Sequence, residues 1–244
     1  MILRKHIYLL IAIAVACTIV ACNKMIIGNG KAKVAQRKTS PFTEINVKGS
    51  LTIYLTQGAK ESLEIATDAN LHSRIKSKVE DGVLYLSIAD KINQPSYAQA
   101  YITYRSLNNI VLDNKSELHS KDLVAFDRIN IESEEHSIVN LHLESDTLDI
   151  TAAGTSSFEL KGNVDQANIK LKGKSLLKGF GLKIDSCNVS TSEFSKAELY
   201  VMKQLSTQQK GRSEVIYRGA VDDETIQSKG NGRIRRHIKK KDEI

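Results

Sequence analysis

The side chains best suited to catalysis or metal binding fall into three small groups. Two are acidic runs, Asp222–Glu224 and Glu132–Glu135, which could act as general acids and bases or bind calcium. The third is His142 with Glu144, whose spacing places both on one face of a strand. Adjacent acids on a strand alternate between faces, so neither run brings two carboxylates to one point. His142 falls between two apolar positions and points outward, so all three groups are expected to be solvated surface residues.

Cysteines offer a different chemistry. Residues 1–21 combine a basic start with a short apolar run that ends in Ile19-Val20-Ala21-Cys22, which resembles the lipidation site of a bacterial lipoprotein. The sequence therefore predicts a signal peptide at 1–21, a lipidated Cys22 and a tether at 22–36; an ordinary cleaved signal or an uncleaved anchor are the alternatives. Cys187 would then be the remaining thiol of the mature chain. It shares an apolar position of the repeat described below, which predicts a buried, unreactive side chain.

The positive charge of the chain is concentrated at its C-terminal end. The formal net charge is +7, and residues 229–244 hold seven basic residues against two acidic ones. A nearly neutral body argues against a nucleic-acid partner, which would require a basic face. The tail is interpreted as a charged cap that stops further strand stacking, or as a contact with anionic lipid or lipopolysaccharide phosphates. The candidate contact residues are Arg233, Arg235, Arg236, Lys239, Lys240 and Lys241.

The elements that position these residues are set by a repeat in the second half of the chain. Serines recur at intervals of 19, 19, 20 and 18 residues, and small or apolar residues follow each of them at two, four and six positions: the serines are Ser137, Ser156, Ser175, Ser195 and Ser213. Alternation with a period of two is strand periodicity, and a unit of about 20 residues is too short for a pair of helices. The pattern predicts a parallel β-solenoid with one rung for each repeat.

A tight corner is expected just before each serine. The residue two positions earlier is glycine or asparagine in five of seven copies, with Glu135 and Glu193 as the exceptions. Glycine and asparagine tolerate a positive φ. The serines are therefore expected to stabilise the corners by hydrogen bonds, in preference to forming a ladder of ligands.

The first part of the mature chain is strand-like without this period. Apolar alternation in residues 43–104, with a hairpin signal at Asp81-Gly82, predicts antiparallel or mixed strands. The sequence is accordingly divided into a β-helical domain at 37–228, with an irregular β section at 37–108 and regular rungs at 109–228, followed by the basic cap or tail at 229–244.

The chain resembles the putative auto-transporter adhesin, head GIN domain family of bacterial lipoproteins over roughly residues 28–231. The resemblance rests on the opening pattern and on the Gly-x-Ser corners: Arg37, Phe42, Ile45-Asn46-Val47-Lys48-Gly49, Ile53-Tyr54-Leu55, Gln57-Gly58, Asn70-Leu71, Gly82-Val83-Leu84, Tyr104-Arg105-Ser106-Leu107, Gly154, Gly173 and Gly211. It implies a right-handed parallel β-helix, export and a role in adhesion, and the family brings no assigned active site.

Three functions are compatible with these features of the sequence. A non-catalytic, adhesin-like binding module of the cell envelope, lipid-anchored and placed in the outer membrane, is preferred; its partner would be a glycan or an envelope protein, and no cofactor is expected. A β-helix-type polysaccharide-active enzyme is the second possibility. The nearly constant repeat length predicts no cleft, and sugar platforms are limited to Tyr97, Tyr101, Tyr104 and Tyr200. A structural protein that self-associates through its solenoid ends is the third. The sequence leaves undecided whether the domain lies on the periplasmic or the outer face of the outer membrane.

Overall fold

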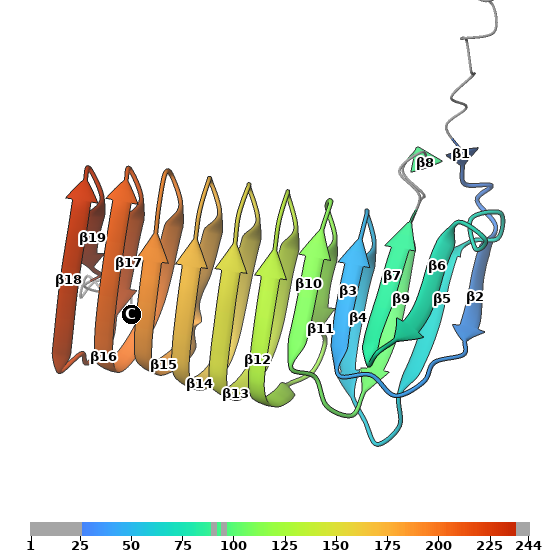
Figure 1. Cartoon of the computed structure of the whole chain (residues 1–244), viewed down its shortest axis with the longest axis horizontal. Coiled ribbons are helices and arrows are strands. Elements are labelled where there is room, and N and C mark those ends of the chain that lie inside the picture. The colour runs from blue at the N-terminus through green and yellow to red at the C-terminus, as the bar shows by residue number, and fades with distance from the viewer. Residues whose placement is uncertain (1–25, 89–91, 94–96, 238–244) are drawn as a thin grey trace, which may run out of the picture.

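The computed structural model describes residues 26–88, 92–93 and 97–237. It is an all-β, right-handed solenoid in which two sheets face each other across one apolar core (Figure 1). No helix among the described residues is long and apolar enough to cross a membrane. The predicted solenoid is confirmed.

The regular rungs are long strands that bend from one sheet into the other. The strands of this region are β10 (Asn109–Asp113), β11 (Glu117–Ser120), β12 (Val124–Ser133), β13 (Ile138–Ala152), β14 (Ser157–Leu171), β15 (Leu176–Thr191), β16 (Lys196–Gly211), β17 (Glu214–Arg218), β18 (Asp223–Gly230) and β19 (Arg233–Arg236). Each pairs in parallel with its neighbour one repeat away. Inward side chains of successive rungs are therefore in register, and buried Ile131, Ile150, Ile169 and Val189 stack in one column.

The N-terminal part extends the same two sheets in a different chain order. Its strands are β2 (Ala32–Arg37), β3 (Glu44–Lys48), β4 (Thr52–Gln57), β5 (Ser62–Asp68), β6 (Ile75–Glu80), β7 (Val83–Ile88) and β9 (Ala98–Tyr104). The rung β3–β4 stacks in parallel between β10–β11 and β7–β9. Beyond these, β2, β5 and β6 pair antiparallel. The expectation of mixed pairing is confirmed, and β1 (Ile26–Ile27) forms a separate two-stranded sheet with β8 (Ile92–Asn93).

The corners follow the expected geometry at every predicted position. All seven residues two before an anchor have a positive φ, from 42° at Glu135 to 82° at Gly230. Even Glu135 and Glu193 adopt it, and the carbonyl of each accepts a hydrogen bond from a neighbouring corner, from Lys115 N at 3.1 Å and from Arg212 N at 2.7 Å. A rung that departed from the conformation of its neighbour would lose these bonds.

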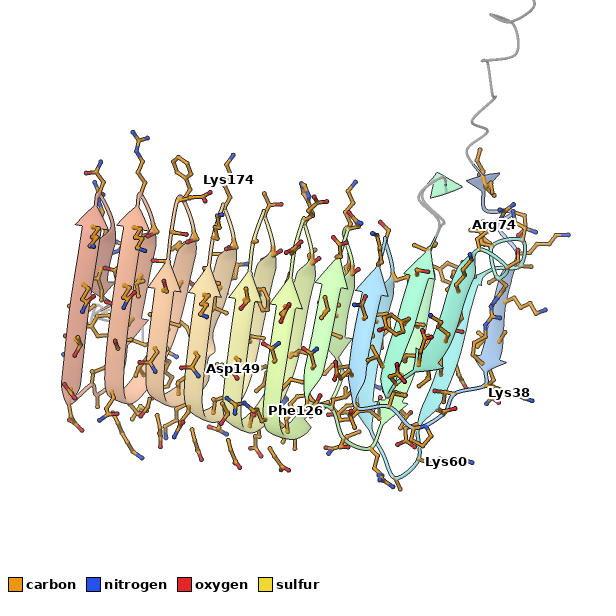
Figure 2. The ribbon with its side chains drawn as sticks, viewed as in Figure 1. Lys38, Lys60, Arg74, Phe126, Asp149 and Lys174 are labelled. Carbon is orange, nitrogen blue, oxygen red and sulfur yellow. The ribbon has the colours of Figure 1, made fainter. Side chains whose placement is uncertain are left out.

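The anchor serines are buried and serve the corners. Each hydroxyl donates to the carbonyl three residues earlier, as Ser137 does to Glu134 at 2.6 Å and Ser175 to Lys172 at 2.8 Å. The prediction of a structural role for the serines is confirmed. Lys174, beside such a corner, points away from the body along the corner edge in Figure 2.

Candidate functional site

The two outer faces of the solenoid differ in how their polar side chains are used. The front sheet of Figure 1, formed by β6, β7, β3, β10 and the second halves of the long strands, carries an amide ladder. Its hydrogen bonds include Asn109 Nδ2 to Glu44 Oε2 at 3.0 Å and Asn168 Nδ2 to Asp149 Oδ1 at 2.8 Å. Asp149, labelled in Figure 2, also accepts from Arg128 Nε at 3.1 Å. The ladder consists of Glu44, Asn109, Asn130, Asp149, Asn168 and Asn188.

The side chains of the ladder are hydrogen-bonded to one another. Asn130 donates to Asn109, and Asn188 donates to Asn168, so each amide contributes to holding two rungs in register. Side chains already paired with each other have less to gain from a ligand, because binding would exchange one hydrogen bond for another. The front face is therefore a structural surface.

The rear face carries a groove of about 630 Å³ that crosses β13, β14, β15 and β16. This volume lies in the range of ligand sites in proteins. Its lining mixes charged, amide and aromatic side chains, among them Asn140, His142, Glu159, Lys161, Phe180 and Glu198. The absence of a cleft predicted from the near-constant repeat length is therefore wrong.

A β-bulge in β15 lies at the groove and contributes Phe180 and Gly181 to its lining. The register of β15 shifts against β14 between Glu159 and Lys161, and against β16 between Gly179 and Lys183. Phe180 lies in this irregular stretch and is only partly buried. The extra residue is visible in the sequence, since the interval from Ser175 to Ser195 is 20 residues instead of 19. The glycines flanking Phe180 and this longer interval are the signal that could have located the bulge.

An arginine fixes the aromatic wall of the groove. Arg218 Nη2 donates to the Phe180 carbonyl at 2.7 Å, and its guanidinium lies 4.6 Å from the centroid of the Tyr200 ring and 5.4 Å from that of Phe180. The Phe180 ring also lies 5.3 Å from the ring of His237. Cation–π contacts of this kind hold a ring in place without covering it fully.

The other side chains of the groove are paired to different degrees. Lys178 Nζ lies 3.8 Å from Glu159 Oε2, and both side chains are more than half exposed. Lys196 lies 2.7 Å from Glu198 Oε1, and Asn140 Nδ2 lies 3.3 Å from His119 Nδ1. The exposed Lys178–Glu159 pair contributes little free energy, so a ligand could replace it at low cost, whereas the Lys196–Glu198 pair is shorter and largely covered.

An aromatic strip continues along the same face toward the N-terminal end. The rings of Tyr101 and Tyr54 stack at 5.1 Å between centroids, and Tyr54 stacks on His119 at 5.5 Å. His119 Nε2 lies 3.2 Å from Glu117 Oε2. In register, Tyr101, Tyr54, His119, Asn140, Glu159, Lys178 and Glu198 form one outward column, so the strip leads directly into the groove.

Most of the individual sequence candidates take no part in this site. The acids of Glu132–Glu135 and Asp222–Glu224 are exposed, and within the described residues no group of His, Cys, Asp or Glu could hold a metal ion. His142 lines the groove, without Glu144. Tyr104, expected on the surface, is buried against Phe126 at 5.6 Å between ring centroids, so that expectation is wrong.

Cys187 is buried as predicted. Burial raises the pKa of its thiol to about 12 and keeps it protonated.

The predicted surface-contact residues are separate from the groove. Arg233, Arg235 and Arg236 lie on β19 and are exposed. Arg235 Nε is 3.1 Å from Glu214 Oε1, and Arg236 Nη2 donates to the Gly219 carbonyl at 2.7 Å. Cys22, Lys239, Lys240 and Lys241 lie outside the described residues.

A family model for the putative auto-transporter adhesin, head GIN domain matches residues 41–220, well over half of the chain. The chain belongs to this family. No curated protein matches it.

Solved structures share the fold of this head GIN domain protein. A putative adhesin from Bacteroides fragilis has a TM-score of 0.82 at 22% identity, covering 87% of this chain and 100% of that one. A putative adhesin from Parabacteroides merdae has a TM-score of 0.68 at 17% identity, covering 87% and 99%. A structure described as a putative lipid binding protein from Parabacteroides distasonis has a TM-score of 0.67 at 19% identity, again covering 87% and 99%.

Proposed function

We propose that this head GIN domain protein is a non-catalytic, adhesin-like binding module of the cell envelope whose rear groove binds a neutral glycan segment. The proposal rests on one observation. The bulge in β15 places Phe180 in the same groove as carboxylate and amide side chains. The family description and the adhesin names of the structural neighbours support the adhesive role.

The chemistry of the groove suits a sugar. Carboxylate and amide groups such as Glu159, Glu198 and Asn140 can each hydrogen-bond two neighbouring hydroxyls. The partly exposed ring of Phe180 offers an apolar surface for the C–H face of a pyranose. Acidic and basic side chains are interspersed in the groove, which favours binding of a neutral glycan over a highly charged one.

A lipid is a poorer fit, although one structural neighbour is named for lipid binding. Acyl chains require a large apolar pocket. The solenoid interior is filled by stacked aliphatic side chains, most of them no more than 2% exposed, and the groove is open and mixed in character.

A catalytic role is disfavoured by the same geometry. Glycoside hydrolysis needs two carboxylates on opposite sides of one bond. Glu159 and Glu198 belong to one outward column in which Lys178 lies between them, so they stand along a surface and do not face each other across a cleft.

We further propose that a lipid on Cys22 holds the protein to the outer membrane. The motif at Ile19–Cys22 supports this assignment. The predicted tether at 22–36 contains β1 and most of β2, and β2 pairs with β5, so the tether does not extend to residue 36. This end of the solenoid lies far from β18 and β19 (Figure 1), so an anchored molecule would project its rungs away from the membrane. An adhesive role requires that the domain face outward.

A glycan panel tests the groove. The full chain carrying Cys22→Ser, which removes the lipidation site, is applied to immobilised glycans, and hits are measured by calorimetry. Phe180→Ala is expected to weaken binding about tenfold or more by removing the apolar platform. Phe194→Ala is the matched control, because Phe194 is a 59% exposed phenylalanine on a corner outside the groove. An unresponsive panel, or equal losses in both variants, would overturn the proposal.

Protease treatment of intact cells tests the location. Digestion of the wild-type protein while a periplasmic marker survives would place the domain outside the cell, and protection would contradict adhesion. Cys22→Ser should move the protein from the membrane fraction to the soluble fraction, whereas retention in the membrane would contradict anchoring through that cysteine.

A further inference from the structure

The C-terminal end of the solenoid leaves core positions uncovered by the described residues. Ile226 occupies the column of Ile131, Ile150, Ile169 and Val189, which are at most 2% exposed, yet Ile226 is 47% exposed. Every residue of β18 is exposed. One rung earlier, Thr207 and Gln209 are buried, and their side-chain polar atoms have no hydrogen-bond partner among the described residues. The last rung therefore behaves as an interior layer without a neighbour.

The main-chain hydrogen-bonding groups of β18 are paired along one side of the strand. It pairs in parallel with β16 through Asp223–Gly230, and no described strand pairs with its other side. Edge strands are usually protected by charges along their length. In β18 the charged residues stand toward the ends, at Asp223, Glu224 and Lys229, while residues 225–228 are uncharged. The edge strand β6 differs, because Lys76 and Lys78 interrupt it.

We propose that β18 pairs antiparallel with β18 of a second copy of this chain, about a two-fold axis through Ile226. Antiparallel partners share a sheet face, so only registers that place Ile226 opposite an inward residue keep core side chains inside. With Ile226 opposite itself, Asp223 stands opposite the partner's Lys229 and Thr225 opposite the partner's Gln227. The strand is thus self-complementary in charge and in apolar contact, as an isologous interface requires.

The opposite end of the molecule does not offer an alternative partner surface. Stacking of a C-terminal end onto an N-terminal end would build open fibres. The N-terminal end is closed by antiparallel β2, β5 and β6, and its edges carry Lys33, Arg37, Lys76 and Lys78. End-to-end pairing therefore stops at two copies.

The dimer has a consequence that rests on the proposed lipid anchor. The tether begins at the β1–β2 end, and the pairing strand lies at the other (Figure 1). Two paired molecules would carry their anchors at opposite ends of the dimer. The dimer would therefore link two membranes through contact between two copies of this chain. The pairing itself does not depend on the anchor.

A charge swap tests the register. In sedimentation experiments on the full chain carrying Cys22→Ser, a small edge interface predicts association in the micromolar range. Asp223→Lys places two like-charged pairs at the interface and should weaken dimerisation at least tenfold. Adding Lys229→Asp should restore it. Asp222→Lys, the same charge change one residue before β18, should leave the dimer unchanged.

A cross-link gives an independent readout. Ile226→Cys should allow a short bifunctional thiol reagent to join the two copies, because opposed antiparallel residues have Cβ atoms about 4.5–5.5 Å apart. A wild-type monomer at 100 µM, or a charge swap that fails to restore association, would overturn the proposal. A monomer in which the introduced thiol is protected would instead indicate that the chain's own tail covers β18.

Liposomes separate the two claims. Lipidated wild-type protein should cluster vesicles, and lipidated Asp223→Lys should not. Vesicles that stay dispersed while the unlipidated protein still dimerises would contradict the anchor and its orientation, and would leave the β18 pairing standing.

Discussion

At its N-terminal end the solenoid is closed by strands that reverse direction, whereas at its C-terminal end the described residues finish in parallel rungs. The N-terminal closure uses antiparallel β2, β5 and β6 and a loop that buries Leu71 completely. The C-terminal end presents β18 and β19, with Ile226 about half exposed and unpartnered Thr207 and Gln209 beneath it.

The difference shows what a solenoid needs in order to end. A rung of parallel strands always leaves an edge and an uncovered core layer. Reversing the chain direction covers the core layer at the N-terminal end, and the edge strands that remain there, β2 and β6, carry basic residues along their length. The C-terminal end keeps an edge strand without charges in its middle, which makes it the end suited to a partner.

The largest expected effect contrasts two equivalent glycines. Gly162 and Gly219 both have a φ of 120°, and a Cβ at either would lie 1.9 Å from a carbonyl oxygen of the preceding rung. Gly162→Ala should lower the free energy of unfolding by about 4 kcal/mol, because rungs on both sides fix its position. Gly219→Ala should cost roughly half as much, since only the last rung has to move. Urea unfolding measures both, and equal losses would contradict a looser C-terminal end.

The next effect compares apolar residues at the two ends. Leu71→Ala removes a fully buried side chain and should cost about 3 kcal/mol. Ile226→Ala should change the stability of the monomer by less than about 0.5 kcal/mol, because its side chain is already half in water. Both are measured at concentrations below dimerisation. A large loss for Ile226→Ala under those conditions would show that something in the same chain covers it.

Much of this architecture can be predicted from the sequence, because the residues that form the corners repeat at regular intervals. The anchor serines and the glycines before them fix rung length, strand direction and the inward columns, so the solenoid follows from local pattern. Glu135 and Glu193 break that pattern and still take a positive φ, because stacking on neighbouring corners imposes it.

The parts that escaped prediction depend on contacts between distant segments. No local sequence pattern predicts that β3–β4 inserts between β10–β11 and β7–β9. The burial of Tyr104 follows from that N-terminal packing. The groove depends on one additional residue near Phe180, which the repeat interval reveals without showing which way the ring points.

A smaller effect concerns the polar residues beneath the open end. The hydroxyl of Thr207 and the amide of Gln209 are buried, and no described residue forms a hydrogen bond with them. Thr207→Val and Gln209→Leu should therefore each stabilise the fold by about 1–2 kcal/mol, since no hydrogen bond is lost and a desolvated polar group is removed. Thermal and urea unfolding report the change. Destabilisation would mean that these groups bind a partner, and it would weaken the description of the last rung as an uncovered interior layer.

The last comparison is between Tyr104 of the N-terminal part and Tyr217 of β17. Their effect on stability is the smallest at neutral pH and becomes measurable at alkaline pH. Burial raises the pKa of Tyr104 far above its usual value, and burial followed by a hydrogen bond with Glu224 raises the pKa of Tyr217. A phenol with a raised folded-state pKa ionises first in the unfolded chain. Its contribution is therefore intact below pH 10 and is lost above it, by about 1.4 kcal/mol per pH unit for a fully buried group. Tyr104→Phe should flatten the fall in stability between pH 10 and 11, and Tyr217→Phe should do so much less, because the open end lets water reach its hydroxyl. If the two variants flatten the alkaline profile equally, the C-terminal end is as well sealed as the N-terminal one.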